Sequence, residues 1–448
     1  MYKVYIRPLC VEDAQISYKW RNDPEVWKFT GSQPDREITH NIELDWIKKV
    51  IADDSGRRFA IIADDQYVGN IQLTNIKDRK AEYHIFIGDK IWWGKGISYL
   101  ATYQILHFAK EELQLEEVFL SVREDNIAAV KSYRKSSFAE DEMKEGWIKM
   151  TCKLALLPPP TVSVFVMVYN HEKYLHECLD GILMQKSNFT FNVVVGEDCS
   201  PDRSREILLE YRKKYPGKFK LLLHEKNIGA VANQNAVYAA CEGKYIALCE
   251  GDDYWTDPLK LQKQVEFLES NPDFVLSGHK VQVIINGELK DTTGKWQTQS
   301  LLFRNVLKKD ILNNFPQIVN GDTFLLFYLE NFGKFEMQDF TGAVYRYTGE
   351  GVWTKLTQSE KLNTAKKSYT QMISFFETYH YKKTAKKVKL WSYDLDFNAF
   401  VKSDRFSYRQ FFTLLSKILY LGDINRIKSL IILLPFFNRG RRDAISVK

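Results

Sequence analysis

An apolar strand runs directly into an acidic loop in Tyr245-Ile246-Ala247-Leu248-Cys249-Glu250-Gly251-Asp252-Asp253-Tyr254-Trp255. Three carboxylates, those of Glu250, Asp252 and Asp253, stand within four residues of this loop. Like charges this close repel one another unless a cation neutralises them, and hard oxygen ligands suit Mg²⁺ or Mn²⁺. The stretch therefore predicts a buried strand that ends in a divalent metal site suited to a nucleotide diphosphate, with a solvated acidic turn as the alternative.

Strands and helices alternate along the sequence before this stretch. Residues 162–168 form a continuous apolar run, as expected of a buried parallel strand, and similar runs follow at 191–195 and 219–223. The alternation predicts a parallel sheet that binds its ligands at the carboxyl ends of its strands. A second acidic cluster, Glu197-Asp198-Cys199-Ser200-Pro201-Asp202, follows one of those ends. Two such clusters at strand ends are hard to attribute to solvation alone.

A glycine loop lies nearer the N-terminus. Strand patterns at 69–73 and 81–87 precede Ile91-Trp92-Trp93-Gly94-Lys95-Gly96-Ile97, and a helical pattern follows at 99–112. Glycines let the backbone approach a phosphate closely, and the free amides of the next helix attract it. The loop predicts anion binding, with a plain strand-to-helix turn as the alternative.

Residues 161 to about 355 resemble family 2 glycosyltransferases with the GT-A fold. The resemblance rests on the two acidic motifs together with Val168-Tyr169-Asn170 and Asn227-Ile228-Gly229. It implies a nucleotide diphosphate sugar as the donor substrate. It further implies that Tyr169 and Asn170 line the nucleotide and that Asp198 contacts the base.

The same resemblance implies metal-binding and catalytic roles. Asp252 and Asp253 match the family's metal-binding pair, and Glu250 stands at its first acidic position. Asp322 occupies the place of the carboxylate that deprotonates the acceptor hydroxyl in inverting enzymes, or else it is the N-cap of the helix that follows. The loop at 344–351 lacks the histidine that the family often places near the diphosphate, so the third metal or phosphate ligand stays open.

Residues 1–155 resemble GCN5-related N-acetyltransferases, especially the branch with ribosomal-protein alanine and amino-sugar acetyltransferases. The shared motifs are Ile6-Arg7-Pro8-Leu9, Trp20-Arg21-Asn22-Asp23-Pro24-Glu25-Val26, Trp93-Gly94-Lys95-Gly96 and Asn126-Ile127-Ala128-Ala129-Val130-Lys131-Ser132-Tyr133. The resemblance implies that the pyrophosphate of acetyl-CoA binds the loop formed by Trp93, Gly94, Lys95, Gly96 and Ile97.

Four further residues are candidates for acetyl transfer. By the resemblance, Tyr133 protonates the departing thiolate and Asn126 lies near the cofactor; a half-buried structural tyrosine is the alternative for Tyr133. Glu82 is our first choice of base, because a partly buried carboxylate could take a proton from an ammonium group. His84, two residues along the same strand face, is the second choice, and either could be an ordinary surface residue.

Composition limits the remaining possibilities. The chain of 448 residues is 45% hydrophobic and 27% charged, which is typical of globular domains, and its net charge of +6 does not support a dedicated nucleic-acid binder. Six cysteines without a C-x-x-C pair favour a reducing cytosol. We expect a cytoplasmic protein, since neither an apolar signal-peptide core nor a spanning stretch of roughly 18 apolar residues occurs.

The sequence predicts an α/β protein with four segments. These are the acetyltransferase domain (1–155), a proline linker (156–161) that holds the halves as tethered neighbours, the glycosyltransferase domain (162–355) and a basic helical region (356–448). The apolar and basic end of the last segment, at 430–442, could contact an anionic membrane or dock on the transferase.

Together the two resemblances predict a bifunctional enzyme of bacterial surface-polysaccharide synthesis. It would acetylate a nucleotide-linked amino sugar and transfer a sugar to a glycan or lipid-linked acceptor. The alternatives are a fused acetyltransferase that acts on protein or peptide, and an acetyltransferase-like domain that only binds.

Overall fold

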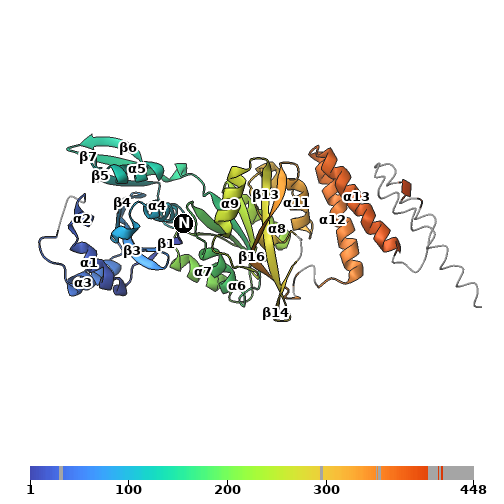
Figure 1. The fold of residues 1–448 in the computed structure, drawn as a ribbon, viewed down its shortest axis with the longest axis horizontal. Coiled ribbons are helices and arrows are strands. Elements are labelled where there is room, and N and C mark those ends of the chain that lie inside the picture. The colour runs from blue at the N-terminus through green and yellow to red at the C-terminus, as the bar shows by residue number, and fades with distance from the viewer. Residues whose placement is uncertain are drawn as a thin grey trace, which may run out of the picture. The chain divides into compact units, whose positions relative to one another are not determined.

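The computed structural model describes residues 1–29, 34–292, 296–349, 351, 355–401, 412, 415 and 416. The chain divides into two compact units. Figure 1 labels the helices and strands along the ribbon. The first comprises Met1–Asn305 and Phe335–Tyr347, and the second comprises Val306–Lys334 and Thr348–Lys448. These divisions fall at other places than our domain boundaries, which stay predictions.

The first unit opens with a seven-stranded sheet of order β1-β2-β3-β4-β5-β7-β6. Only β4 and β5 run parallel, and their pairing covers just the first three residues of each strand, Lys80–Glu82 and Glu117–Phe119. Both strands continue beyond that point, so they separate. The strands are β1 (Val4–Pro8), β2 (Arg57–Ala63), β3 (Gln66–Lys77), β4 (Lys80–Ile87), β5 (Glu117–Arg123), β6 (Ala139–Lys144) and β7 (Trp147–Lys153).

Helices cover both faces of this sheet. One face packs its apolar side chains against α4 and α5, and the other packs against α1 and α3 through a smaller cluster that includes Trp20 and Ile47. The helices are η1 (Val11–Asp13), α1 (Ala14–Arg21), α2 (Pro24–Trp27), α3 (His40–Ile51), η2 (Lys90–Trp92), α4 (Ile97–Glu111), α5 (Ile127–Lys135) and η3 (Leu154–Leu156). The predicted strands and helices of this region are confirmed.

A nine-stranded sheet of order β10-β9-β8-β11-β15-β13-β16-β12 completes the first unit, with β14 paired to β13. Strands β10, β9, β8 and β11 are parallel neighbours, as the alternation predicted. The strands are β8 (Val162–Val168), β9 (Phe191–Glu197), β10 (Phe219–Leu223), β11 (Tyr245–Glu250), β12 (Tyr254–Trp255), β13 (Phe274–Ile285), β14 (Glu288–Asp291), β15 (Leu302–Arg304) and β16 (Lys334–Arg346). The helices are α6 (Leu175–Leu183), α7 (Ser204–Lys214), α8 (Ala230–Ala240), α9 (Lys260–Ser270) and η4 (Thr298–Ser300).

The proline linker is attached to the second sheet and does not stand free. Pro160 is buried, its carbonyl oxygen accepts a hydrogen bond from Lys244 N (3.3 Å), and Thr161 N donates to Thr190 O (3.0 Å). The regions before and after the linker also meet, since Tyr2 forms an isolated β-bridge with Ser187. The two sheets therefore belong to one compact unit, which is a closer association than the tethered neighbours that we expected.

The second unit is helical and packs through aromatic rings. Phe324 lies 4.8 to 5.4 Å, between ring centroids, from the rings of Phe315, Phe375 and Phe376. Its helices are α10 (Lys309–Asn313), α11 (Gly321–Leu329), α12 (Gln358–Thr378) and α13 (Lys382–Val401). The last two confirm the predicted helical character of the C-terminal region up to Val401. The basic stretch at 430–442 lies outside the described residues. Within the described part of the chain, every helix is too short or too polar to cross a membrane.

Candidate active sites

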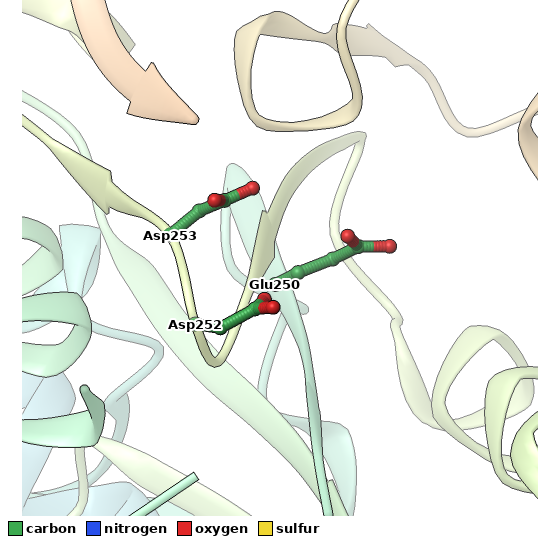
Figure 2. Close-up of side chains that lie close together, drawn as sticks. All are labelled: Glu250, Asp252 and Asp253. Carbon is green, nitrogen blue, oxygen red and sulfur yellow. The ribbon is translucent and has the colours of Figure 1, made fainter. Parts of the chain in front are cut away.

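The predicted metal-binding carboxylates meet at the carboxyl end of β11. One oxygen atom from each of Glu250, Asp252 and Asp253 lies within 4.8 Å of the others, and Figure 2 shows all three side chains extending to the same side of the loop. Gly251 lets the loop lie against β8, because a Cβ atom there would stand 2.5 Å from His171 Nδ1 and 2.8 Å from Met167 O. The sequence thus folds these like charges into one cluster.

Asp253 is the buried member of this cluster. Its Oδ1 accepts a hydrogen bond from Arg346 N (2.7 Å), whereas its buried Oδ2 has no hydrogen-bond partner among the described residues. Burial raises the pKa of Asp253 well above its ordinary value, and the charges of Asp252 and Glu250 raise it further. An orphaned buried oxygen beside two more carboxylates fits a divalent cation, so these three residues could hold one.

Arg346 is the residue of this site that the sequence analysis did not single out. It ends β16, where its Nη1 donates to Asp252 O (2.8 Å) and its Nη2 pairs with Glu177. Its guanidinium also lies over the rings of Tyr174 (4.7 Å) and Tyr254 (5.1 Å). An arginine therefore supports the acidic loop from the segment 344–351, in which the sequence analysis expected a histidine. The position of Arg346 at the end of the short apolar run Ala343-Val344-Tyr345 was the signal in the sequence.

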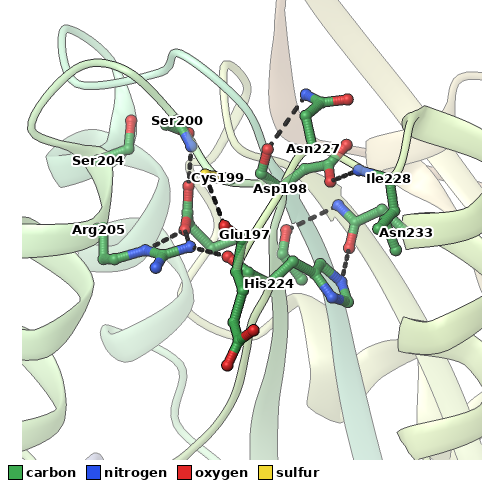
Figure 3. Close-up of polar contacts among 12 residues, drawn as sticks. Glu197, Asp198, Cys199, Ser200, Ser204, Arg205, His224, Asn227, Ile228 and Asn233 are labelled. Carbon is green, nitrogen blue, oxygen red and sulfur yellow. Dashed lines mark hydrogen bonds and ion pairs between the residues drawn. The ribbon is translucent and has the colours of Figure 1, made fainter.

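The second acidic cluster holds loops together (Figure 3). Asp198 is buried, and its two oxygens accept hydrogen bonds from Ile228 N (2.7 Å) and Gly229 N (3.0 Å). Glu197 accepts from Ser200 N (2.6 Å) and pairs with Arg205. The contact of Asp198 with a nucleotide base stays a prediction, and the geometry gives this carboxylate an anchoring role.

Tyr169 and Asn170 follow β8, the strand that lies between β9 and β11 in the sheet. Both residues are exposed, and Asn170 N donates to Ser200 Oγ (3.0 Å) from a left-handed conformation (φ 61°). The candidate nucleotide-lining residues and both acidic clusters therefore come together at one edge of the parallel strands.

Asp322 lies in the second unit as the second residue of α11. It is exposed, and its Oδ1 accepts a hydrogen bond from Thr323 N (2.7 Å). Asn320 occupies the N-cap position of the helix, so the interpretation of Asp322 as an N-cap is wrong. Its role as a base stays a prediction.

The glycine loop has the backbone shape of an anion cradle. Gly94 (φ 71°) and Gly96 (φ 78°) are both left-handed, and a Cβ atom on either would meet nothing within 4 Å. Gly96 is the N-cap of the fifteen-residue helix α4, whose first amides have no partner within the helix. Trp93 is 44% exposed, whereas Ile97 is buried.

The side chain of Lys95 turns toward aromatic rings at this loop. Its ammonium lies 5.1 Å from the ring centroid of Trp92 and 5.7 Å from that of Tyr2. An anion bound at this loop would therefore be held by its amides and the helix dipole, to which Lys95 adds positive charge nearby.

Asn126 is the N-cap of α5, and Tyr133 lies within that helix. The Asn126 side chain accepts a hydrogen bond from Ala129 N (3.2 Å) and caps the helix. Tyr133 packs against Tyr83 and Phe138, and burial raises its pKa to about 12. A tyrosine with this pKa keeps its proton at neutral pH, as a general acid requires.

Glu82 and His84 lie where β4 and β5 separate. Glu82 belongs to the last paired position of the two strands, and its Oε2 accepts from Asn75 Nδ2 (2.7 Å). His84 Nε2 lies 3.0 Å from Thr74 Oγ1 and 3.6 Å from Glu82 Oε1. Burial lowers the pKa of His84, while the charge of Glu82 opposes that shift. The two candidate bases are neighbours, and the choice between them stays open.

Comparisons with known proteins agree with this arrangement. The family profile "Acetyltransferase (GNAT) domain" matches residues 3–139, and "Glycosyl transferase family 2" matches residues 163–322. The chain therefore carries a domain of each family, and both are enzyme families. The chain thus has an acetyltransferase-like mixed α/β domain and a GT-A-like domain, as the sequence analysis predicted.

Individual relatives match parts of the chain. An uncharacterized protein of Mycobacterium tuberculosis is 34% identical over 233 residues, which are 48% of this chain and 64% of that protein. The putative teichuronic acid biosynthesis glycosyltransferase TuaG of Bacillus subtilis is 32% identical over 123 residues, 27% of this chain and 48% of TuaG. The crystal structure of S. aureus TarS in complex with UDP-GlcNAc has 20% identity and a TM-score of 0.44 over 60% of this chain and 83% of that chain. Each curated relative extends beyond the part that it shares with this chain.

Proposed function

We propose that the chain is a bifunctional enzyme of surface-polysaccharide synthesis. One domain N-acetylates a nucleotide-linked amino sugar with acetyl-CoA, and the other transfers a sugar from a nucleotide diphosphate to a glycan or lipid-linked acceptor with inversion. The observation that carries the proposal is the convergence of Tyr169, Asp198 and the Glu250–Asp253 cluster at one edge of the parallel strands. The name of TuaG, a teichuronic acid biosynthesis glycosyltransferase, supports the polysaccharide context.

In the sugar transfer, Asp322 accepts the proton of the acceptor hydroxyl. The acceptor oxygen then attacks the anomeric carbon of the donor, and the bond from that carbon to the diphosphate oxygen breaks. A Mn²⁺ or Mg²⁺ ion held by Glu250, Asp252 and Asp253 would neutralise the charge of the diphosphate. Arg346 keeps the acidic loop in position through its bond to Asp252 O.

In the acetyl transfer, the amine nitrogen attacks the acetyl carbonyl carbon and the carbon–sulfur bond breaks. Glu82, or His84 beside it, takes the proton that leaves the nitrogen. Tyr133, which its raised pKa keeps protonated at neutral pH, donates a proton to the departing thiolate. The glycine loop and the first turn of α4 hold the pyrophosphate through backbone amides.

The acetyl transfer is tested on the full chain with acetyl-CoA and a panel of amines, namely nucleotide-linked amino sugars, ribosomal-type N-terminal peptides and polyamines. Release of the free thiol measures turnover. We expect the nucleotide-linked amino sugars to react fastest, and Tyr133→Phe to slow the reaction by about a hundred-fold. A preference for peptides would overturn the proposed substrate, and unchanged rates in Tyr133→Phe and Glu82→Gln would overturn these roles.

The sugar transfer is tested by donor binding. Calorimetry measures the affinity for a panel of nucleoside diphosphates with and without Mn²⁺. Mn²⁺ should increase the affinity of the wild type and should not increase that of Asp252→Asn. Asp322→Asn should bind the same nucleoside diphosphate normally and fail to transfer sugar. Binding that ignores the metal would exclude the metal-dependent mechanism.

We further propose a cytoplasmic location with peripheral membrane contact through the basic C-terminal region, because a lipid-linked acceptor would lie there. Co-sedimentation of the full chain with vesicles of anionic and of neutral lipid tests this contact. We expect retention on the anionic vesicles that falls with added salt, and equal behaviour on both lipids would contradict it.

A further inference from the structure

One arginine of the acetyltransferase domain has an unusual environment for a structural ion pair. Arg21 ends α1, and its Nε pairs with Glu43 Oε2 (3.2 Å). Glu43 is buried and also accepts from Ser17 Oγ (2.7 Å). The two terminal nitrogens of Arg21 donate to none of the described residues, and its side chain is 17% exposed. Glu43 therefore fixes one edge of the guanidinium and leaves the forked edge open.

Aromatic rings surround this guanidinium. Its central carbon lies 4.4 Å from the ring centroid of Trp46, 5.3 Å from that of Trp27 and 6.0 Å from that of Phe86. Trp27 is itself held by a hydrogen bond from its Nε1 to Arg21 O (2.8 Å). Rings that stack on a guanidinium restrict its plane, so the open fork has a fixed direction.

Two other arginines on this side of the sheet are used within the protein. Both terminal nitrogens of Arg7 donate to the Asp13 carboxylate, at 2.6 and 2.8 Å. Arg58 donates from Nη1 to Val50 O (3.3 Å), and its Nη2 lies 3.5 Å from Asp53. Arg21 is the member of this trio whose terminal nitrogens make no hydrogen bond to the described residues.

The open fork lies on the sheet face that carries the candidate bases. Glu82, His84 and Phe86 alternate along β4 and so point to one face, and the Arg21 guanidinium lies against the Phe86 ring. Glu82 and Phe86 are separated by about 13 Å, four residues at roughly 3.3 Å each. An acceptor of about this length, with its amine at Glu82 or His84, would therefore place its opposite end near Phe86 and the guanidinium of Arg21.

We propose that Arg21 binds a phosphate oxygen pair of the acetyl acceptor and thereby selects an anionic, phosphorylated amine. A guanidinium fork matches two phosphate oxygens, and such charge-assisted pairs are stronger than neutral hydrogen bonds. This inference rests on the proposed acetyl transfer and specifies its substrate class. The competing ligand of the same chemistry is a phosphate of acetyl-CoA, and the competing role is a purely structural ion pair with Glu43.

The test compares two acceptors on the full chain, the nucleotide-linked amino sugar with the highest turnover in the panel and the same amino sugar without phosphate. Arg21→Gln should raise the KM of the phosphorylated acceptor by about ten- to a hundred-fold and leave that of the other acceptor unchanged. The KM of acetyl-CoA and the kcat at saturation should stay within about two-fold. Lys19→Gln, which removes an exposed charge from the same helix, is the matched control and should change nothing.

Two further variants keep the test valid if Arg21→Gln leaves Glu43 unpaired and misfolds. Arg21→Lys retains the charge beside Glu43 but lacks the forked pair of nitrogens. It should therefore fold and still raise the KM of the phosphorylated acceptor. Arg21→Gln combined with Glu43→Gln removes both charges and should behave like Arg21→Gln.

Several results would overturn the assignment. A rise in the KM of acetyl-CoA would place the cofactor phosphate at Arg21, and an equal loss with both acceptors would make the residue structural. If only unphosphorylated amines react, the proposed nucleotide-sugar substrate fails while acetyl transfer stands. In that case the anion site is tested with inorganic pyrophosphate. It must inhibit competitively against the amine, and its inhibition constant must rise at least ten-fold in Arg21→Gln; any other result overturns the anion site. A chain that acetylates no amine overturns both proposals.

Discussion

The loop after β9 and the loop after β11 lie on either side of β8, and each contains a buried aspartate. The two aspartates differ in how many of their carboxylate oxygens accept hydrogen bonds. Both oxygens of Asp198 accept backbone hydrogen bonds from a loop thirty residues further along the chain. Asp253 has one oxygen bonded and one without a partner among the described residues, and two carboxylates stand beside it. A buried charge that the protein satisfies serves the scaffold, whereas one left unsatisfied is a place for a ligand.

The largest effect should come from the unsatisfied carboxylate. Asp253→Asn should reduce glycosyl transfer by about a thousand-fold, since a bound metal contributes several kcal/mol to stabilising the transition state. The same variant should unfold at an equal or higher temperature than the metal-free wild type, because a repelling charge is removed. Transfer rates and thermal unfolding in a chelator measure the two quantities, and a marked loss of stability would remove the contrast with Asp198.

Asp198→Ala should show the reverse pattern. Its removal leaves the amide of Ile228 without an acceptor and leaves Gly229 N only its longer bond to Asn227 Oδ1 (3.1 Å), which should cost about 2 kcal/mol of unfolding free energy. Urea unfolding measures this loss. Metal affinity, read by Mn²⁺ titration of the folded variant, should change little, and a severe loss of metal binding would show that the two loops are not independent.

Arg346→Gln should have an intermediate effect on the acidic loop alone. Loss of its bonds to Asp252 O and Glu177 should weaken Mn²⁺ binding by about ten-fold, as is usual for residues that orient metal ligands. The Asp253 Oδ1 contact should survive, since it comes from the backbone nitrogen. Calorimetric Mn²⁺ titration measures the change, and Lys263→Gln, which breaks an ion pair with Asp257 elsewhere in the domain, serves as the control.

The smallest effect should be a dependence of metal-free stability on pH. The pKa of Asp253 is raised in the folded state above the ordinary 3.8, so the unfolded chain loses this proton first as the pH rises. The contribution of Asp253 is fully present below pH 3.8 and is lost as the pH rises through the folded-state pKa. In a chelator, the Tm of Asp253→Asn minus that of the wild type should therefore grow by a few degrees from pH 4 to pH 8. Saturating Mn²⁺ should abolish the trend, and a flat difference without metal would contradict the raised pKa.

Sequence patterns predicted the elements that depend on local order. Apolar runs and their spacing identified the parallel strands, and the carboxylates directly after β9 and β11 identified the candidate site. The pairing of Tyr254 with Val344 was invisible, because it joins residues ninety positions apart, and it is this pairing that brings Arg346 to the acidic loop. For the same reason no local pattern could distinguish Asp198 from Asp253, since their hydrogen-bond donors lie far along the chain.

The acetyltransferase domain was harder to interpret from its residues. Binding of an anion by backbone amides depends on backbone shape, so residue types alone left a plain turn as an equal alternative; the structure adds that Gly94 and Gly96 are left-handed. The pair of Arg21 and Glu43 joins α1 to α3 and required the tertiary structure. Side-chain chemistry at strand ends is therefore easier to predict than a site made by amides and long-range ion pairs.

The attachment of the proline linker has a practical consequence for dissecting the protein. Tyr5 stacks edge-on against Tyr215 (5.1 Å), and Gly217 packs so closely on α4 that a Cβ atom there would lie 1.9 Å from Gln104 O. Separating the fragments of a chain cut at Pro159 would expose aromatic side chains of both fragments to solvent. Co-expressed fragments should therefore reassociate without a covalent link, and either fragment produced by itself should be prone to aggregation.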